Sequence, residues 1–272
     1  MKKVYVITGG TGGMGKAIAR RFGHQGHLLL VDVDEERLIQ TVSELALEGI
    51  TFVTTRKVDI TDEYQVNELA ALTGEIGELG AIIHTAGLSP TMGEPRRILE
   101  VNSVGTGLIL KAFLPLATQE TVAVCIASNG GHMVPRNEAY NSILTHPLEP
   151  EFLYQMEKIT SSSEAAYSFS KLGVLLMVED QAWDWGQKGA RIVSLSPGTI
   201  NTPMGRQEAS KQEAMKVLLA NTPLGREGEA DEIASAVQFL CSSDASYITG
   251  TDLLVDGGTT AGMRRIAKFN QK

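Results

Sequence analysis

Cysteine is scarce in this sequence, with 2 residues among 272. Cys125 lies in an apolar, strand-like run and Cys241 ends a helical one, so we interpret both as reduced core thiols rather than as a disulfide or metal site. The five histidines show no metal-ligand spacing, and the His-Glu-x-x-His pattern is absent. We therefore predict a fold that needs neither cross-links nor a metal ion.

Basic charge is also limited, because 24 lysines and arginines stand against 32 aspartates and glutamates. The resulting net charge of −8 argues against the concentrated basic face that binds nucleic acids. One basic cluster stands out, and we interpret it as a solvated tail: Arg264, Arg265, Lys268 and Lys272.

Long apolar runs are missing as well. None approaches the roughly 18 residues that a membrane-spanning helix needs. Residues 4–7 are too few for the core of a signal peptide, and a glycine-rich stretch interrupts them at once. We expect a cytoplasmic protein that binds neither nucleic acid nor membrane.

What the sequence does contain is a regular alternation of short β-branched runs and longer amphipathic segments. This pattern predicts repeated β-α-β units and an α/β fold, in which helices cover both faces of a doubly wound, parallel, seven-stranded sheet. We expect strands at residues 4–8, 28–33, 51–58, 81–85, 122–127, 191–196 and 253–255. We expect helices at residues 15–23, 35–48, 62–72, 99–116, 164–185, 207–220 and 229–241.

The helix ends carry their own signals. Asp34 and Thr61 can each offer a capping oxygen to the helix that follows, and Gly49 fits a helix stop. No linker, repeat or low-complexity tract divides the chain, so we expect residues 1–272 to form a single domain.

A glycine-rich turn at residues 8–15 follows the first expected strand and opens the first helix. Glycine lets the main chain approach a pyrophosphate, and a helix N-terminus offers unpaired N–H groups and a partial positive charge. The turn fits both the G-x-G-x-x-G and the T-G-x-x-x-G-x-G dinucleotide patterns. A P-loop fits less well, because Ala17 stands where a magnesium-binding hydroxyl is required.

Asp32 ends the second expected strand, where ligands of open α/β sheets bind. Its carboxylate can accept hydrogen bonds from both hydroxyls of an adenosine ribose and would repel a 2′-phosphate. No lysine or arginine lies in the glycine turn. Asp32 could instead be a turn residue, a role that Asp34 can also fill. The sequence favours NAD as cofactor over NADP.

Tyr167 and Lys171 lie four residues apart in a segment of helical pattern, so one turn stacks them about 6 Å apart along the axis. Alone, this spacing also fits an exposed helical pair. Ser128 follows an expected strand but lacks the G-x-S-x-G elbow of a hydrolase nucleophile. The context of these residues has to decide their role.

Taken together, these motifs resemble the short-chain dehydrogenase/reductase family over nearly the whole chain, which implies a Rossmann fold and hydride transfer to or from a nicotinamide cofactor. Asn102, Ser128, Tyr167 and Lys171 fall in the order of the family's catalytic tetrad. The resemblance also implies cofactor contacts from Gly9, Thr11, Gly12, Gly13, Met14, Gly15, Asp32, Val33, Asp59, Ile60, Thr85, Ala86, Gly87, Asn102, Tyr167, Lys171, Pro197, Gly198, Ile200 and Thr202.

The resemblance implies a separate role for each residue of the tetrad. Tyr167 is the expected acid/base, and although the pKa of free tyrosine is near 10, a neighbouring ammonium and an oxidised nicotinamide favour its phenolate. Lys171 is expected to supply that ammonium and to hold the nicotinamide ribose. Ser128 is expected to bind the substrate oxygen, and Asn102 to hold a helix bend and a water that relays protons.

Two places depart from the family pattern. His84 and Thr85 stand where the family has two asparagines that brace the sheet, so the Thr85 hydroxyl or a water has to replace an amide, and we do not expect His84 to be catalytic. The stretch between Ser128 and Tyr167 is also enlarged, which, with residues 86–90, resembles the bacterial 3α-hydroxysteroid dehydrogenase/carbonyl reductase branch.

The enlarged stretch, residues 132–163, is too long for an ordinary loop. Chain continuity places its ends beside two tetrad members, so we predict a partly helical lid that selects an apolar, steroid-like or other bulky ketone or secondary alcohol. Packing on the surface or against a neighbouring subunit is the alternative. The expected substrate contacts are Leu88, Ser128, Asn129, Phe152 and Met204, with Met215 beside them.

Other functions stay open from the sequence. A catalytically idle NAD-binding sensor or scaffold could use the same fold. An NAD-dependent epimerase or dehydratase needs a further C-terminal domain, for which little chain follows Thr202. We also expect a homodimer or homotetramer, with apolar residues of 174–185 at the subunit interface.

Overall fold

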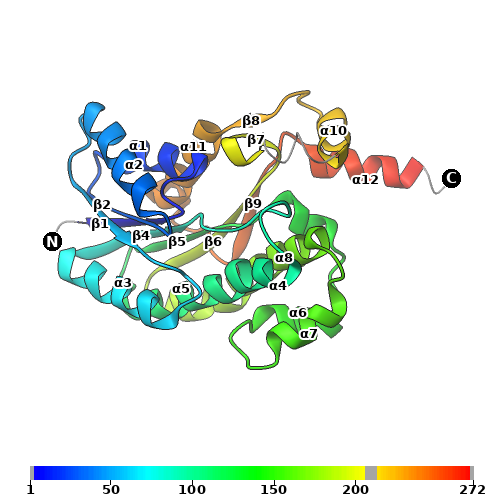
Figure 1. The fold of residues 1–272 in the computed structure, drawn as a ribbon, viewed down its shortest axis with the longest axis horizontal. Coiled ribbons are helices and arrows are strands. Elements are labelled where there is room, and N and C mark those ends of the chain that lie inside the picture. The colour runs from blue at the N-terminus through cyan, green and yellow to red at the C-terminus, as the bar shows by residue number, and fades with distance from the viewer. Residues whose placement is uncertain (1–2, 206–212, 270–272) are drawn as a thin grey trace.

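The structure is a computed structural model that describes residues 3–205 and 213–269 (Figure 1). All seven expected strands are present and form one parallel sheet, in the order β3-β2-β1-β4-β5-β6-β9. They are β1 (Lys3–Thr8), β2 (His27–Asp32), β3 (Val53–Lys57), β4 (Glu78–His84), β5 (Val122–Ile126), β6 (Arg191–Pro197) and β9 (Thr251–Val255). Two short strands, β7 (Ile200–Asn201) and β8 (Gly228–Glu229), pair separately.

Helices lie on both faces of this sheet, as the alternating pattern predicts (Figure 1). One face carries α1 (Gly13–Phe22), α2 (Glu35–Leu47) and α11 (Ala230–Cys241). The other carries α3 (Glu63–Ile76), α4 (Pro95–Leu99), α5 (Thr106–Phe113) and α8 (Ser163–Gln187). Two outlying helices are α10 (Glu213–Ala220) and α12 (Thr259–Phe269), the latter extending away from the body in Figure 1.

Two apolar clusters fill the space between the sheet and its two helical layers. Strand β2 shows how one run serves both clusters. Leu29 and Val31 belong to one cluster, whereas Leu28 and Leu30 belong to the other. Successive side chains of a strand point to opposite faces, so a strand covered on both faces must be apolar at every position.

The helix ends confirm two of the three cap predictions. Asp34 accepts a hydrogen bond from the amide of Arg37 at the start of α2, and Gly49 follows the end of that helix with a φ of +82°. The third prediction was wrong, because Asp62 rather than Thr61 caps α3. The Thr61 hydroxyl is instead bonded to the carboxylate of Asp59.

The helix expected at residues 99–116 starts at Pro95 and is interrupted by a π-helix, Glu100–Gly105, before α5 begins. Among the described residues, Pro95–Leu116 is the one helical run long and apolar enough to span a membrane. Two thirds of its apolar window, 67%, is buried inside the fold. Packing on the sheet therefore accounts for the apolar character of this run.

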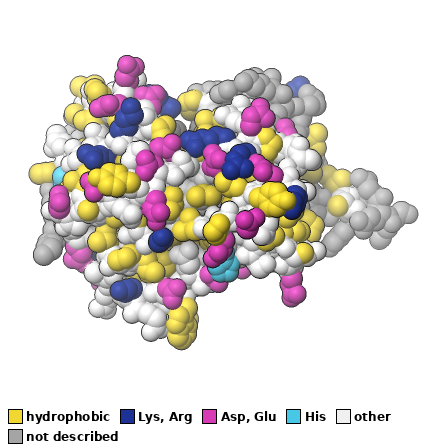
Figure 2. Space-filling view, turned by 60° about the horizontal axis from the view of Figure 1, so that its bottom comes forward, with side chains coloured by type: hydrophobic (Ala, Val, Ile, Leu, Met, Phe, Trp, Pro, Cys, Tyr) yellow, Lys and Arg dark blue, Asp and Glu magenta, His cyan; other side chains and the backbone are white. Residues whose placement is uncertain are grey.

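Residues 132–163, expected from the sequence to form a partly helical lid, contain two helices. They include α6 (Glu138–Thr145) and α7 (Phe152–Ile159), of which α6 lies against α8 and α7 against α4. At Gly173 of α8, an added Cβ would lie 3.5 Å from Leu144 of α6. The segment is thus partly helical, and Leu144, Phe152 and Met156 are buried, whereas Met133, Leu148 and Tyr154 are exposed. Figure 2, seen from this side of the molecule, shows apolar, acidic and basic side chains interspersed.

The same packing buries most of the apolar residues of α8 that were expected to form a subunit interface. Leu175, Leu176 and Val178 were expected to offer spare apolar surface, but all three are buried within the chain. Trp183, in contrast, is 74% exposed. The surplus apolar face of α8 is therefore largely covered by the chain itself.

Candidate active site

The carboxyl ends of β1, β2, β4, β5 and β6 lie at one edge of the sheet, because all the strands run parallel. Ligands of open α/β sheets bind at this edge. The turns that follow these strands carry most of the residues singled out in the sequence.

The glycine turn after β1 requires glycine for steric reasons. Gly9 has a φ of +66°, and a Cβ there would lie 2.8 Å from the amide nitrogen of Ala86. A Cβ on Gly15 would lie 2.3 Å from the carbonyl oxygen of Gly9. At Gly12, in contrast, the same carbonyl oxygen, 3.2 Å away, is the one neighbour within 4 Å. The turn is tightly packed beneath and open above Gly12.

Helix α1 follows this turn without a side-chain cap and without an acidic residue in its first turn. Its first N–H groups therefore keep their capacity to bind an anion, helped by the helix dipole. Met14, in that first turn, is partly buried against the apolar cluster below. The open glycine and the uncapped helix fit the pyrophosphate of a nicotinamide dinucleotide.

Asp32 is held in place at the end of β2. Its Oδ2 accepts hydrogen bonds from the hydroxyl of Thr11 at 2.6 Å and from the Thr11 amide at 3.2 Å. Its Oδ1 accepts one from the amide of Val33, whose side chain is exposed beside it. Arg37, which the sequence did not single out, donates from Nη2 to the Thr11 carbonyl at 3.0 Å. The carboxylate is thus fixed next to the glycine turn.

Asp59 and Ile60 follow β3 and have different environments. Burial would raise the pKa of Asp59, but hydrogen bonds from Thr61 and the guanidinium of Arg97 outweigh it and hold that pKa below its usual range. The Arg97 Nη2 lies 3.1 Å from Asp59 Oδ2. Ile60 is buried, and a Cβ on Gly105 of the π-helix would lie 2.8 Å from it. Arg97 was missed because nothing local in the sequence pairs it with Asp59.

Tyr167 and Lys171 lie one turn apart on α8, as their spacing predicts. The Lys171 ammonium is buried, donates to the carbonyl of Ile126 at 3.0 Å, and lies 5.7 Å from the centre of the Tyr167 ring. A buried ammonium close to a phenol is the charge arrangement that favours phenolate formation.

Ser128 follows β5 and faces the same region. Its Oγ accepts a hydrogen bond from the amide of Gly130 at 3.1 Å. A Cβ on Gly130 would lie 3.4 Å from Cε1 of Tyr167 and 3.5 Å from Ser128 Oγ, so both side chains border this glycine. Asn129 is buried beside Ser128. The next glycine, Gly131, lies so close to α8 that a Cβ would be 2.8 Å from the Lys171 carbonyl carbon.

Asn102, in the π-helix, is fixed by three hydrogen bonds. Its Oδ1 accepts from the amide of Leu88 at 2.7 Å, and its Nδ2 donates to the Leu88 carbonyl and to the hydroxyl of Ser170. A Cβ on Gly87 would lie 3.1 Å from Asn102 Oδ1 and 3.5 Å from Lys171 Nζ. Gly87 therefore marks the point where Asn102 and Lys171 meet. Ser170 was not identified from the sequence.

The turn after β6 lies against the glycine turn. Pro197 ends the strand, and the Gly198 amide donates to the Val255 carbonyl. Ile200 and Thr202 are buried. A Cβ on Gly13 would lie 2.8 Å from Thr202 Cγ2, which brings the two turns into contact.

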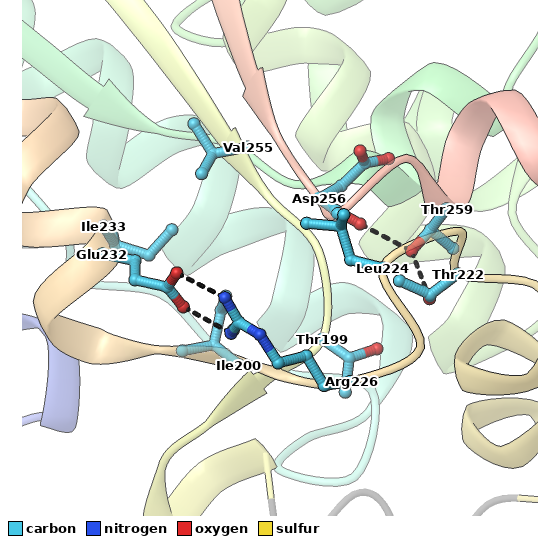
Figure 3. Close-up of a pocket in the computed structure, with 12 residues that line it drawn as sticks. Thr199, Ile200, Thr222, Leu224, Arg226, Glu232, Ile233, Val255, Asp256 and Thr259 are labelled. Atoms are coloured by element: carbon cyan, nitrogen blue, oxygen red, sulfur yellow. Dashed lines mark hydrogen bonds and ion pairs between the residues drawn. The ribbon is translucent and has the colours of Figure 1, made fainter.

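A small pocket of about 90 Å³ lies behind this turn, lined by Thr199, Ile200 and residues of β9 and α11 (Figure 3). Figure 3 shows the ion pair of Arg226 with Glu232 on one side of it, at 2.8 Å. The hydroxyls of Thr222 and Thr259 meet on the other side. These contacts hold residues 222–229, which precede α11, against α11 and α12.

His84 and Thr85 replace the two missing amides with other bonds. The Thr85 hydroxyl donates to the Thr8 carbonyl at 2.7 Å, which is the replacement expected from the sequence. His84 is buried, and both its ring nitrogens have hydroxyl partners, on Thr8 and Thr106. Burial, with a smaller effect of Lys171, lowers the pKa of His84 to about 3.

The expected substrate contacts separate into two groups. Leu88, Ser128 and Asn129 lie with the tetrad, and Met204 is exposed just beyond Thr202. Phe152 is 2% exposed and belongs to the larger apolar cluster, so its assignment as a substrate contact is corrected. The side chain of Met215 lies outside the described residues.

Sequence profiles of known families match both halves of the chain. The profile described as short chain dehydrogenase matches residues 3–142. A second profile, described as enoyl-(acyl carrier protein) reductase, matches residues 153–260. The two matches together span the sheet and the site.

Individual relatives align along almost the full chain. The short-chain dehydrogenase/reductase bsc3 of Alternaria brassicicola is 34% identical over 271 residues, covering 97% of this chain and 98% of its own. Glucose 1-dehydrogenase 2 of Bacillus subtilis is 29% identical, with 95% of each chain covered. The solved structure of levodione reductase is 28% identical, with a TM-score of 0.76 over 96% of this chain and 98% of that chain. The chain belongs to the short-chain dehydrogenase/reductase family.

Proposed function

We propose that this chain is an NAD(H)-dependent oxidoreductase that interconverts a secondary alcohol and a ketone, with Tyr167 as the acid/base. One observation carries the proposal: all four tetrad residues converge on Gly87 and Gly130, next to the open glycine turn. The nicotinamide, when bound, supplies the hydride acceptor or donor. The chain itself supplies the proton and the positioning.

Each tetrad side chain has a role that follows from its contacts. The Lys171 ammonium favours the Tyr167 phenolate, which takes the proton of an alcohol or, once protonated, gives it to a ketone oxygen. The Ser128 hydroxyl accepts from the Gly130 amide and donates to Asn129 Oδ1 over a long 3.4 Å bond. In our proposal the substrate oxygen takes the place of Asn129 as the acceptor of that proton. Asn102 holds the turn at Leu88 against α8.

The choice of NAD(H) rests on Asp32. Its carboxylate is fixed at the end of β2 by Thr11 and Val33, where it favours ribose hydroxyls and repels a 2′-phosphate. Membership of the family indicates a dehydrogenase or reductase. The Asp32 carboxylate is the reason why we propose NAD(H) rather than NADP(H) as its cofactor.

A mainly apolar ring ketone or its alcohol, such as a steroid-like compound, is our proposed substrate class. Leu88 is partly buried beside the tetrad, and Met204 is exposed two residues after Thr202. Methionine suits adaptable apolar pockets. Levodione reductase, among the relatives, is named for a carbonyl substrate.

We further propose that the protein is cytoplasmic and that it forms a homodimer or homotetramer.

The direct test follows NADH absorbance with a panel of ring and open-chain ketones. Tyr167→Phe is expected to lower kcat by about a thousandfold or more while NADH binds nearly as before, because the phenol proton is lost but few cofactor contacts are. Tyr154→Phe, on the exposed face of α7, is the matched control and should retain full activity. NADH binding without turnover of any ketone would instead favour an NAD-binding sensor.

A further inference from the structure

His84 bridges two elements that border the site. Its Nδ1 lies 2.7 Å from Thr8 Oγ1 on β1, and its Nε2 lies 3.0 Å from Thr106 Oγ1 on α5. Thr8 and His84 are direct partners across the β1–β4 ladder, which places the ring at the end of both strands. The residue is 3% exposed.

The partners of the two threonines fix the direction of these bonds. The Thr106 hydroxyl donates to the Asn102 carbonyl at 2.7 Å, and a carbonyl can only accept. The hydroxyl has one proton, so it must accept from His84, and Nε2 must carry the ring proton. Nδ1 is then an acceptor and receives the hydroxyl proton of Thr8.

The chain of bonds has its two ends at the active site. At one end, the amide of Ala86 donates to Thr8 Oγ1 at 3.3 Å. At the other end is the carbonyl of Asn102 in the π-helix. The side chain of Asn102 accepts a hydrogen bond from the Leu88 amide. The turn at residues 86–88, which adjoins both the glycine turn and the tetrad, is thus held from two sides.

The surroundings keep the ring neutral. Cys125, its ladder partner on β5, is an uncharged thiol, because burial raises its pKa to about 12. Within residues 3–205 and 213–269, the charged group that acts on the ring is the Lys171 ammonium, which opposes a positive charge on the ring. Neutrality is required by the bond directions, since a doubly protonated ring could no longer accept from Thr8.

We infer that His84 is a positioning residue, locked as the neutral Nε2–H tautomer, that holds the active-site π-helix and the turn at residues 86–88 in their working arrangement through Thr8 and Thr106. The inference rests on the proposed function for its effect on turnover, but not for the tautomer. His84 acts through Thr8 and Thr106 and is not itself a catalytic residue.

The tautomer is tested by nitrogen-15 NMR of the wild-type protein without cofactor, with His84→Asn used to assign the signals. We expect a protonated Nε2 and an unprotonated Nδ1 at pH 7, and the same pattern at pH 5. A protonated Nδ1, or a doubly protonated ring at pH 5, would overturn the inference even if the enzyme proves inactive.

The positioning role is tested by kinetics on three variants. His84→Leu removes both ring bonds and is expected to lower kcat roughly ten- to a hundredfold, because small displacements of catalytic groups are costly. NADH affinity should change less than about threefold, since Thr85 still ties the turn to β1. His84→Asn, with one acceptor and one donor, should recover part of kcat.

The matched control is His27→Leu, which removes a histidine–threonine bond of similar length between β2 and β3. It should leave kcat unchanged. If His84→Leu keeps the wild-type kcat while Tyr167→Phe abolishes it, the positioning role fails and the proposed function stands. Should His84→Leu fail to fold, Thr106→Val serves instead, since it removes the link to the Asn102 carbonyl, and an unchanged kcat there has the same meaning.

Discussion

The hydroxyl of Thr11 donates a 2.6 Å hydrogen bond to Oδ2 of Asp32 and so joins the glycine turn to the end of β2. This bond fixes the carboxylate before any cofactor arrives. A binding group that is already in place loses little conformational entropy on binding. The fixed carboxylate should therefore discriminate between NADH and NADPH.

We expect Asp32→Ala to narrow the preference for NADH over NADPH by about tenfold or more in kcat/KM, since the repulsion of a 2′-phosphate is removed. Arg37, bonded to the Thr11 carbonyl, remains nearby as a cation. The measurement is kcat/KM with both cofactors on one ketone. Asp34→Ala is the control, because Asp34 caps α2 and should affect stability rather than cofactor choice. A wild-type preference for NADPH would contradict the assignment.

Lys171→Ala is expected to damage both catalysis and NADH affinity, unlike Tyr167→Phe. The ammonium is buried between the Ile126 carbonyl and the tyrosine ring, and we assign it a contact with the cofactor as well. Fluorescence titration of NADH and steady-state rates would separate the two effects. Unchanged NADH binding in Lys171→Ala would remove the cofactor role from this residue.

Phe152→Ala should act on stability rather than on substrate choice. The ring is buried in the core, so its loss is expected to cost about 3–5 kcal/mol of unfolding free energy. Urea denaturation measures this loss, and Leu153→Ala, at a partly buried neighbour, should cost less. A selective rise in KM for bulky ketones, with stability retained, would restore the lid expected from the sequence.

Acid should destabilise the protein through His84. Its folded-state pKa of about 3 lies below the ordinary 6.5, so the unfolded chain binds the extra proton first as pH falls. Stability from this residue is present above pH 6.5 and is lost toward pH 3. From pH 7 to pH 5 we expect a loss of about 2 kcal/mol that His84→Asn does not show. An equal loss of unfolding free energy in the wild type and in His84→Asn would show that the pKa of His84 is not lowered.

Much of the fold follows from local patterns. Strands such as β2 are apolar throughout because both faces are covered, and all seven were found in the sequence. The cap of α3 was misplaced by one residue because Thr61 and Asp62 both offer an oxygen, and only the structure shows that Thr61 is bonded to Asp59.

The site shows a similar limit. Asp32 and the pair of Tyr167 and Lys171 could be identified because strand ends and helical spacing bring them to one edge. Arg97 could not, since its partner is 38 residues away in the chain. Phe152 was misassigned because an amphipathic helix has the same pattern whether its apolar face meets a ligand or another helix.

Helix α8 is covered by the sheet on one side and by α6 on the other, so that every residue from Ser170 to Val178 is buried. Amide hydrogens in such a stretch exchange with solvent only when a large part of the fold opens. Lys171 lies inside it, and Tyr167 lies one turn before it. The catalytic pair therefore stands on an element that should be among the last to open in hydrogen exchange, so its geometry persists for as long as the folded state itself.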